Sequence, residues 1–116
     1  MSITRLDPHE RLSGAVIHGG LVWLAGQVTQ DPALDTERQT ADVLKQIDAL
    51  LAQAGSSKAD ILSVQIFLPD ITTIDAMNRA WDAWLDAACK PARATVEARL
   101  ADPGWKVEMT LVARIP

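Results

Sequence analysis

The spacing of apolar residues changes along this chain from a period of two to a helical period and back again, which fixes the order of its elements. Branched or alternating apolar runs predict strands, and apolar residues three or four positions apart predict helices. The expected strands cover residues 12–18, 21–28, 60–68, 93–100 and 106–115, and the expected helices begin near 36 and 72. The sequence therefore predicts an α+β fold with the order β-β-α-β-α-β-β, in which two helices pack on one face of a mixed sheet.

Turn and capping signals place the boundaries of these elements. His18-Gly19-Gly20 separates two apolar runs and predicts a hairpin, since glycine accepts positive φ. Thr36 and Gln39 have the spacing of a capping box at the start of the first helix, and Gly55 ends it. The second helix is expected to continue to Cys89-Lys90-Pro91.

The two final strands are expected to form a hairpin around the turn at residues 101–104. Alternation predicts one polar face for this hairpin, made of Arg93, Thr95, Glu97 and Arg99 on one strand and Lys106, Glu108 and Thr110 on the next. In the second helix, Trp81 and Trp84 follow helical spacing with apolar neighbours, so they are interpreted as core residues.

Residues 21–28 and 61–68 carry large apolar side chains on both faces of a strand. Such strands are usually buried on both sides. Because two helices cover only one face of the sheet, the other face is expected to be covered by further copies of the chain.

The composition bounds the class of protein. The 116 residues fit one domain, residues 1–116, and the net charge of −4 disfavours nucleic acid as a partner. One cysteine and two histidines cannot form a closed zinc site, so no metal is expected, and a lone Cys89 indicates a reducing compartment. The N-terminus lacks a signal-peptide pattern and the glycines and polar residues of 12–30 oppose a membrane span, so a cytoplasmic protein is predicted.

Motifs for zinc deaminases, phosphate-binding loops, dinucleotide folds and serine hydrolases are absent from the sequence. The candidate site is Arg93, which follows Pro91-Ala92 at the start of a strand. A guanidinium in that position can project into a cleft and hold a carboxylate through two parallel hydrogen bonds. Glu108 on the final strand could orient or activate a water molecule.

These residues resemble the signature of the Rid family of reactive intermediate imine deaminases, also called the YjgF family. The resemblance lies in Pro91-Ala92-Arg93-Ala94-Thr95-Val96 and Val107-Glu108-Met109, and extends to the opening hairpin around Gly19 to Gln27. It implies a chorismate-mutase-like fold, a homotrimer with clefts between subunits, and hydrolysis of 2-enamines and 2-imines to 2-keto acids and ammonia without a cofactor. Arg93 would then bind the substrate carboxylate, Glu108 would position the attacking water, and groups near Gly26 and Thr95 would line the pocket.

Three positions depart from that family's pattern: Leu12 replaces a tyrosine, Ala25 a serine, and Thr95 a cysteine. The loss of the polar groups at positions 12 and 25 makes a bulkier or more apolar imino acid as plausible as 2-aminoacrylate. A second hypothesis stays open, in which the chain is a non-catalytic binder of a small carboxylate metabolite at the trimer clefts. Retention of Glu108 favours the hydrolase, since a binder of carboxylates does not need it. An RNA-directed activity is disfavoured by the acidic balance.

Overall fold

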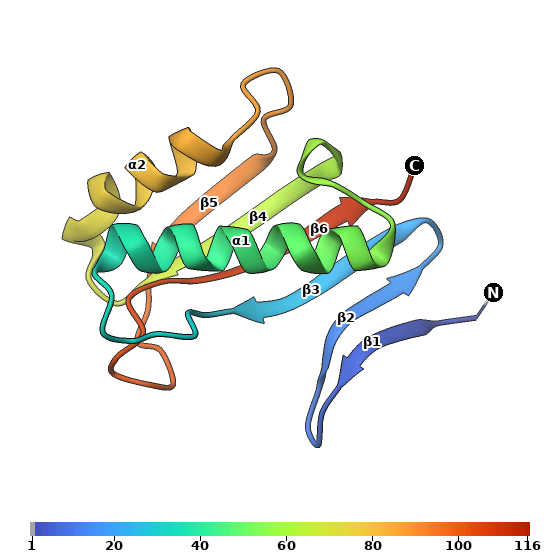
Figure 1. Ribbon diagram of the computed structural model, residues 1–116, viewed down its shortest axis with the longest axis horizontal. Coiled ribbons are helices and arrows are strands. Elements are labelled where there is room, and N and C mark those ends of the chain that lie inside the picture. The colour runs from blue at the N-terminus through green and yellow to red at the C-terminus, as the bar shows by residue number, and fades with distance from the viewer. Residues whose placement is uncertain (1) are drawn as a thin grey trace.

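The computed structural model describes residues 2–116, which form a six-stranded mixed sheet with two α-helices on one of its faces (Figure 1). The strands are β1 Thr4–Pro8, β2 Ser13–His18, β3 Leu21–Gln27, β4 Ile61–Leu68, β5 Ala92–Glu97 and β6 Glu108–Arg114. The helices are α1 Thr36–Ala54 and α2 Ile74–Trp84, and short 3-10 turns cover Lys58–Asp60 and Ile71–Thr73. The predicted α+β class, with both helices on one face, is confirmed. We call the other face the open face.

The strands lie in the order β1-β2-β3-β6-β4-β5. β5 pairs with β4 in parallel, whereas β6 pairs antiparallel with both β3 and β4. The prediction that the last two strands form a hairpin was therefore wrong. α2 acts as a crossover that returns the chain parallel to β4 at the sheet edge, and β6 then fills the position between β3 and β4.

The sheet also has a strand that the periodicity did not predict. β1 pairs antiparallel with β2 at the sheet edge, and its side chains are exposed except for a half-buried Leu6. A strand with so little burial has no apolar period to detect. Asp7 takes a positive φ of 47° in this strand, where Leu6 pairs with Ala15 and Pro8 pairs with Ser13.

The N-terminal cap of α1 and the C-terminal end of α2 differ from the sequence prediction. α1 is capped by Asp35, whose carboxylate accepts a hydrogen bond from the Arg38 backbone N–H at 2.9 Å, so Thr36 and Gln39 do not form the expected capping box. Gly55 ends α1 with φ 84°, as predicted. α2 ends at Trp84, where the Lys58 ammonium donates to the Trp84 carbonyl at 2.6 Å, well before Cys89.

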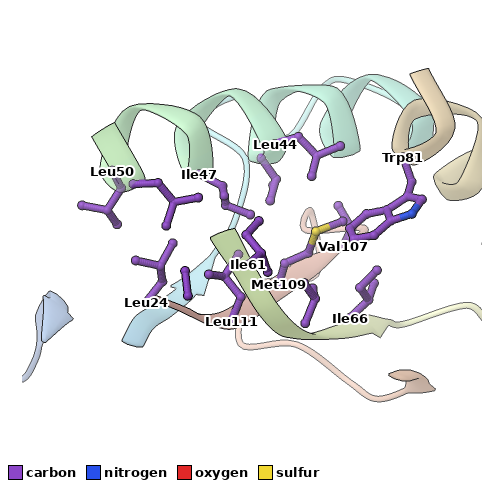
Figure 2. Close-up of a cluster of buried hydrophobic side chains, with 14 of the residues drawn as sticks. Leu24, Leu44, Ile47, Leu50, Ile61, Ile66, Trp81, Val107, Met109 and Leu111 are labelled. Atoms are coloured by element: carbon purple, nitrogen blue, oxygen red, sulfur yellow. The ribbon is translucent and has the colours of Figure 1, made fainter. Parts of the chain in front are cut away.

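The core lies between the helices and the sheet (Figure 2). α1 supplies Leu44, Ile47 and Leu50, α2 supplies Met77 and Trp81, and they pack against inward-facing side chains of the central strands. The inward residues of β6 alternate as the sequence predicted, namely Met109, Leu111 and Ala113, and the inward residues of β4 are Val64, Ile66 and Leu68. Because side chains alternate along a strand, the residues between these inward ones point to the open face.

Gln39 is a fully buried amide that joins two loops of the chain. Its Nε2 donates to the carbonyls of Leu34 at 3.1 Å and Gly104 at 2.9 Å, with a longer contact to Pro32, and its Oε1 accepts from the Lys106 N–H at 2.8 Å. One loop follows β3 and the other precedes β6. Gln39 therefore fixes the chain two residues before Glu108.

We expect Gln39→Leu to lower the free energy of unfolding by about 3 kcal/mol, since it leaves buried carbonyls and an N–H without partners. Urea unfolding measures the loss. Gln53→Leu on the exposed side of α1 is the matched control and is expected to leave stability within about 0.5 kcal/mol of wild type. Equal stability of Gln39→Leu and wild type would show that the amide does not hold the loops.

Candidate functional site

Arg93 lies on the helix face of the sheet, at its β5 edge. It pairs with the buried Val64 of β4, so its side chain leaves the sheet toward α2. There the Arg93 Nη1 donates to Asn78 Oδ1 at 2.9 Å, and its Cζ lies over the Trp81 ring, 5.2 Å from the centroid. Within residues 2–116 the two ion pairs are Arg79–Glu37 and Arg114–Asp60. Arg93 is thus oriented by neutral groups, and its charge is not neutralised by a carboxylate.

Thr95 points to the same face as Arg93, because it pairs with the buried Ile66. Its hydroxyl oxygen is buried and has no hydrogen-bond partner among residues 2–116. An unsatisfied buried hydroxyl costs about 1–3 kcal/mol and calls for an explanation. We call Arg93, Thr95, Asn78 and Trp81 the arginine cluster.

Glu108 lies on the open face. It stands between Val107 and Met109 on β6, which are both fully buried on the helix side, so its side chain points the other way. The carboxylate rests against Gly26, where an added Cβ would overlap Oε2 and lie 2.9 Å from Cδ. Gly26 is therefore the residue that leaves room for this carboxylate.

A β-bulge brings Gly26 to this position. The register between β3 and β6 shifts between Leu24 and Gln27, which places an extra residue in β3 around Ala25. Leu12 precedes β2 and is 55% exposed. Since Ala15 pairs with Leu24 in an antiparallel ladder, Leu12 lies toward the end of β3 that carries Ala25 and Gly26. We call Glu108, Gly26, Ala25 and Leu12 the glutamate cluster.

The loop that follows Gly26 is anchored to α1. Thr29 donates its hydroxyl to Asp42 at 2.7 Å, and the Gln30 N–H donates to the same carboxylate at 2.9 Å. The Thr29 hydrogen bond, followed by that from Gln30, holds the pKa of Asp42 below its usual value. The charged form of Asp42 therefore holds the chain beyond the glutamate cluster.

One copy of the chain does not bring the two clusters together. Arg93 aligns through Val64 with Leu111, three residues beyond Glu108, and β5 lies two strands from β6. These offsets separate the two Cα atoms by roughly 14 Å. The side chains also leave opposite faces of the sheet. The prediction that Arg93, Thr95 and Glu108 share one polar face was therefore wrong, because it assumed that β5 and β6 are neighbours.

The open face carries the apolar surface that the sequence predicted. Trp23, Leu62 and Val96 remain 41%, 48% and 46% exposed. A shallow hollow of about 520 Å³ crosses the sheet from Trp23 on β3, past Thr110 and Val112 on β6, to Ala92 and Ala94 on β5. An aromatic ring and branched side chains exposed together are typical of an assembly surface.

Sequence reasoning missed two members of the arginine cluster. Asn78 and Trp81 are three residues apart on α2, the spacing that puts two side chains on one helix face. Trp81 is a core residue, as predicted, at 5% exposure, but it also contacts the arginine. No group of three metal-binding side chains occurs in the described part of the chain, and neither helix there is long and apolar enough to span a membrane.

The sequence predicts that Arg93 binds a carboxylate, and we expect Asn78→Asp to weaken that binding roughly tenfold or more, since the new carboxylate pairs with the guanidinium and repels an anionic ligand. Calorimetric titration with 2-oxobutanoate measures the change. Asn78→Ala removes the same hydrogen bond without adding charge, and its smaller effect is the control. Equal affinities for the Asp and Ala variants would contradict a free cation at Arg93.

Comparison with known proteins finds the same family by sequence and by structure. Residues 2–115 match the family model described as endoribonuclease L-PSP. A RutC family protein of Haemophilus influenzae is 50% identical over 117 residues, covering 97% of this chain and 98% of that protein.

Two solved structures have the same fold along 97% or more of this chain. NMB1025 of Neisseria meningitidis, a member of the YjgF protein family, is 45% identical with a TM-score of 0.97 over 100% of this chain and 97% of that chain. YyfA of Yersinia pestis, from the Rid protein family, is 29% identical with a TM-score of 0.90, covering 97% of this chain and 99% of that chain.

Proposed function

This chain belongs to the YjgF family, whose members are also named Rid and RutC family proteins, and from that membership we propose that it hydrolyses 2-imino acids. The products are a 2-keto acid and ammonia, and a 2-enamine would enter after tautomerising to the imine. The observation that carries the proposal is the arginine cluster: Arg93 is held in place by Asn78 and Trp81 without a carboxylate partner among residues 2–116.

Arg93 binds the substrate carboxylate. Of the five N–H groups of a guanidinium, one is donated to Asn78, which leaves enough for two parallel hydrogen bonds to a planar carboxylate. This contact fixes the plane of the substrate and hence the position of its C2 atom. The Thr95 side chain lies on the same face as Arg93 and is assigned to the lining of the substrate pocket.

Glu108 positions the attacking water. Its carboxylate takes a proton from the water, whose oxygen adds to C2 while the C=N electron pair moves to nitrogen. Glu108 passes that proton to the nitrogen, which gives a carbinolamine that carries a hydroxyl and an amino group on C2. The hydroxyl proton then moves to the amino nitrogen by way of Glu108, so that the C–N bond breaks, ammonia leaves and the C2 carbonyl forms. A positioned carboxylate of this kind contributes typically 10²- to 10⁴-fold to the rate. No cofactor enters this balance.

The site combines two copies of the chain. Arg93 and Glu108 leave opposite faces of one sheet, so one small substrate contacts both only when the arginine cluster of one copy meets the glutamate cluster of another. The exposed apolar open face supports such an assembly. We propose a homotrimer with active sites between subunits, located in the cytoplasm, and imino acids as its small-molecule partners.

The substrate side chain is proposed to be apolar and larger than a methylene group. Leu12 and Ala25 offer no hydroxyl group in the glutamate cluster. The net charge of −4 disfavours RNA as the substrate, although the matching family model is described as endoribonuclease L-PSP.

The test is hydrolysis of imino acids generated in place by an amino-acid oxidase, followed as the loss of semicarbazone formation. Imines with side chains from methyl to aromatic are compared. Faster loss of at least one imine than in buffer supports the hydrolase. If no imine is consumed faster but 2-oxobutanoate binds and binding requires Arg93, the chain is the non-catalytic carboxylate binder instead.

A further inference from the structure

Arg93 stands on an edge strand with an exposed side chain, where a guanidinium would ordinarily sample many rotamers. Two contacts restrict it. The Asn78 oxygen holds Nη1, and the Trp81 ring lies beneath Cζ at 5.2 Å from its centroid. The ring provides attraction without a hydrogen-bond acceptor, so the N–H edges of the guanidinium stay available.

The Trp81 ring is itself fixed by a chain of contacts that reaches α1. Trp81 is 5% exposed and packs against Trp84 with a centroid separation of 5.5 Å and an interplanar angle of 51°. Trp84 donates its indole N–H to Asp48 at 2.9 Å, and the Lys58 ammonium lies 5.4 Å over the Trp84 ring. These contacts hold the Trp81 ring in its place beneath Arg93.

We propose that Trp81 is a positioning residue, which presents the Arg93 guanidinium to the substrate carboxylate in one orientation. This inference rests on the proposed function. An acidic residue in the place of Trp81 would also hold the arginine, but it would neutralise the charge and compete with the substrate. An aromatic ring orients the guanidinium without neutralising its positive charge, which stays available to the substrate carboxylate.

The test is calorimetric titration of the intact protein with 2-oxobutanoate, a 2-keto acid of the product class. We expect Trp81→Leu to weaken binding by roughly two- to thirtyfold, the range of a cation–π contact, and Trp81→Phe to restore part of the affinity. KM for the imine rises by a similar factor, because the carboxylate contact is made in both the ground and the transition state. Adding Trp81→Leu to Arg93→Ala has no further effect on affinity.

Trp84→Leu is the matched control, since it removes an indole from the same helix that contacts Lys58 and Asp48 rather than Arg93. Because Trp84 packs against Trp81, a small loss of affinity is expected, well below that of Trp81→Leu, since the Trp81 ring remains beneath Arg93. Equal affinity of folded Trp81→Leu and wild type, with binding still dependent on Arg93, would overturn the inference and leave the proposed function standing. Absence of both binding and turnover in the wild type would overturn both.

The contact between Trp81 and Arg93 can also be tested in the wild-type protein, so that the result does not depend on whether a variant folds. The Trp81 ring current should shift the NMR resonance of the Arg93 Nε–H upfield relative to that of the exposed Arg99. An Arg93 resonance at the same position as that of Arg99 would contradict the contact.

Discussion

Arg93→Ala should lower kcat/KM for the preferred imine by roughly 100-fold or more, the typical cost of removing one partner of a desolvated, hydrogen-bonded charge pair. The substitution removes the group that fixes the substrate carboxylate, so affinity for 2-oxobutanoate falls with it. Because Arg93 is exposed and lies at the sheet edge, its loss leaves the core intact. The oxidase-coupled semicarbazone assay measures the rate, and calorimetry measures the affinity.

Arg99→Ala is the matched control for charge, since Arg99 is exposed and lies just beyond β5. Its activity should equal that of wild type. Unchanged kcat/KM in a folded Arg93→Ala variant would exclude Arg93 as the carboxylate-binding group.

Glu108→Gln should lower kcat by about 10² to 10⁴, the usual contribution of a positioned acid or base, with little change in affinity for 2-oxobutanoate. Glutamine has nearly the same shape, so it fits beside Gly26 as the carboxylate does. It cannot take a proton from water. Glu108→Gln therefore slows the chemical step and leaves binding unchanged, whereas Arg93→Ala also weakens binding.

Glu97→Gln is the control for Glu108. Glu97 lies on β5 and accepts a hydrogen bond from the Ile71 N–H at 3.0 Å, which a glutamine oxygen can also accept. It should retain wild-type kcat. Wild-type kcat in the Glu108→Gln variant would show that Glu108 takes no part in the chemical step. The rate would then depend on the orientation of the substrate by Arg93 alone.

The periodicity of the chain predicted every element with a buried face. It missed β1, whose exposed residues have no apolar pattern, and it extended α2 beyond Trp84, where the backbone of Leu85 is extended. Alternation shows which residues share a face of one strand, but it does not say which strands are neighbours. For that reason the sequence did not place β6 between β3 and β4.

Because alternation does not identify neighbouring strands, the arrangement of the site residues was also predicted wrongly. Arg93, Thr95, Gly26 and Glu108 were all identified from sequence, and their roles remain predictions. Their arrangement depends on the pairing of Arg93 with Val64 and of Glu108 with Phe67, which long-range contacts decide. The contact between Trp81 and Arg93 was not predicted, because the helical spacing of Trp81 already accounted for it as a core residue.

The most direct test of the composite site is to mix the Arg93→Ala and Glu108→Gln variants under conditions in which subunits exchange. Each variant is nearly inactive by itself. If Arg93 and Glu108 of different subunits form each site, an equal mixture has about one quarter of its sites intact, since each residue is intact in half of the subunits. The account therefore predicts about a quarter of wild-type activity from the exchanged mixture. Activity no higher than the average of the separate variants, in a mixture shown by native mass spectrometry to contain mixed oligomers, would contradict a site shared between subunits.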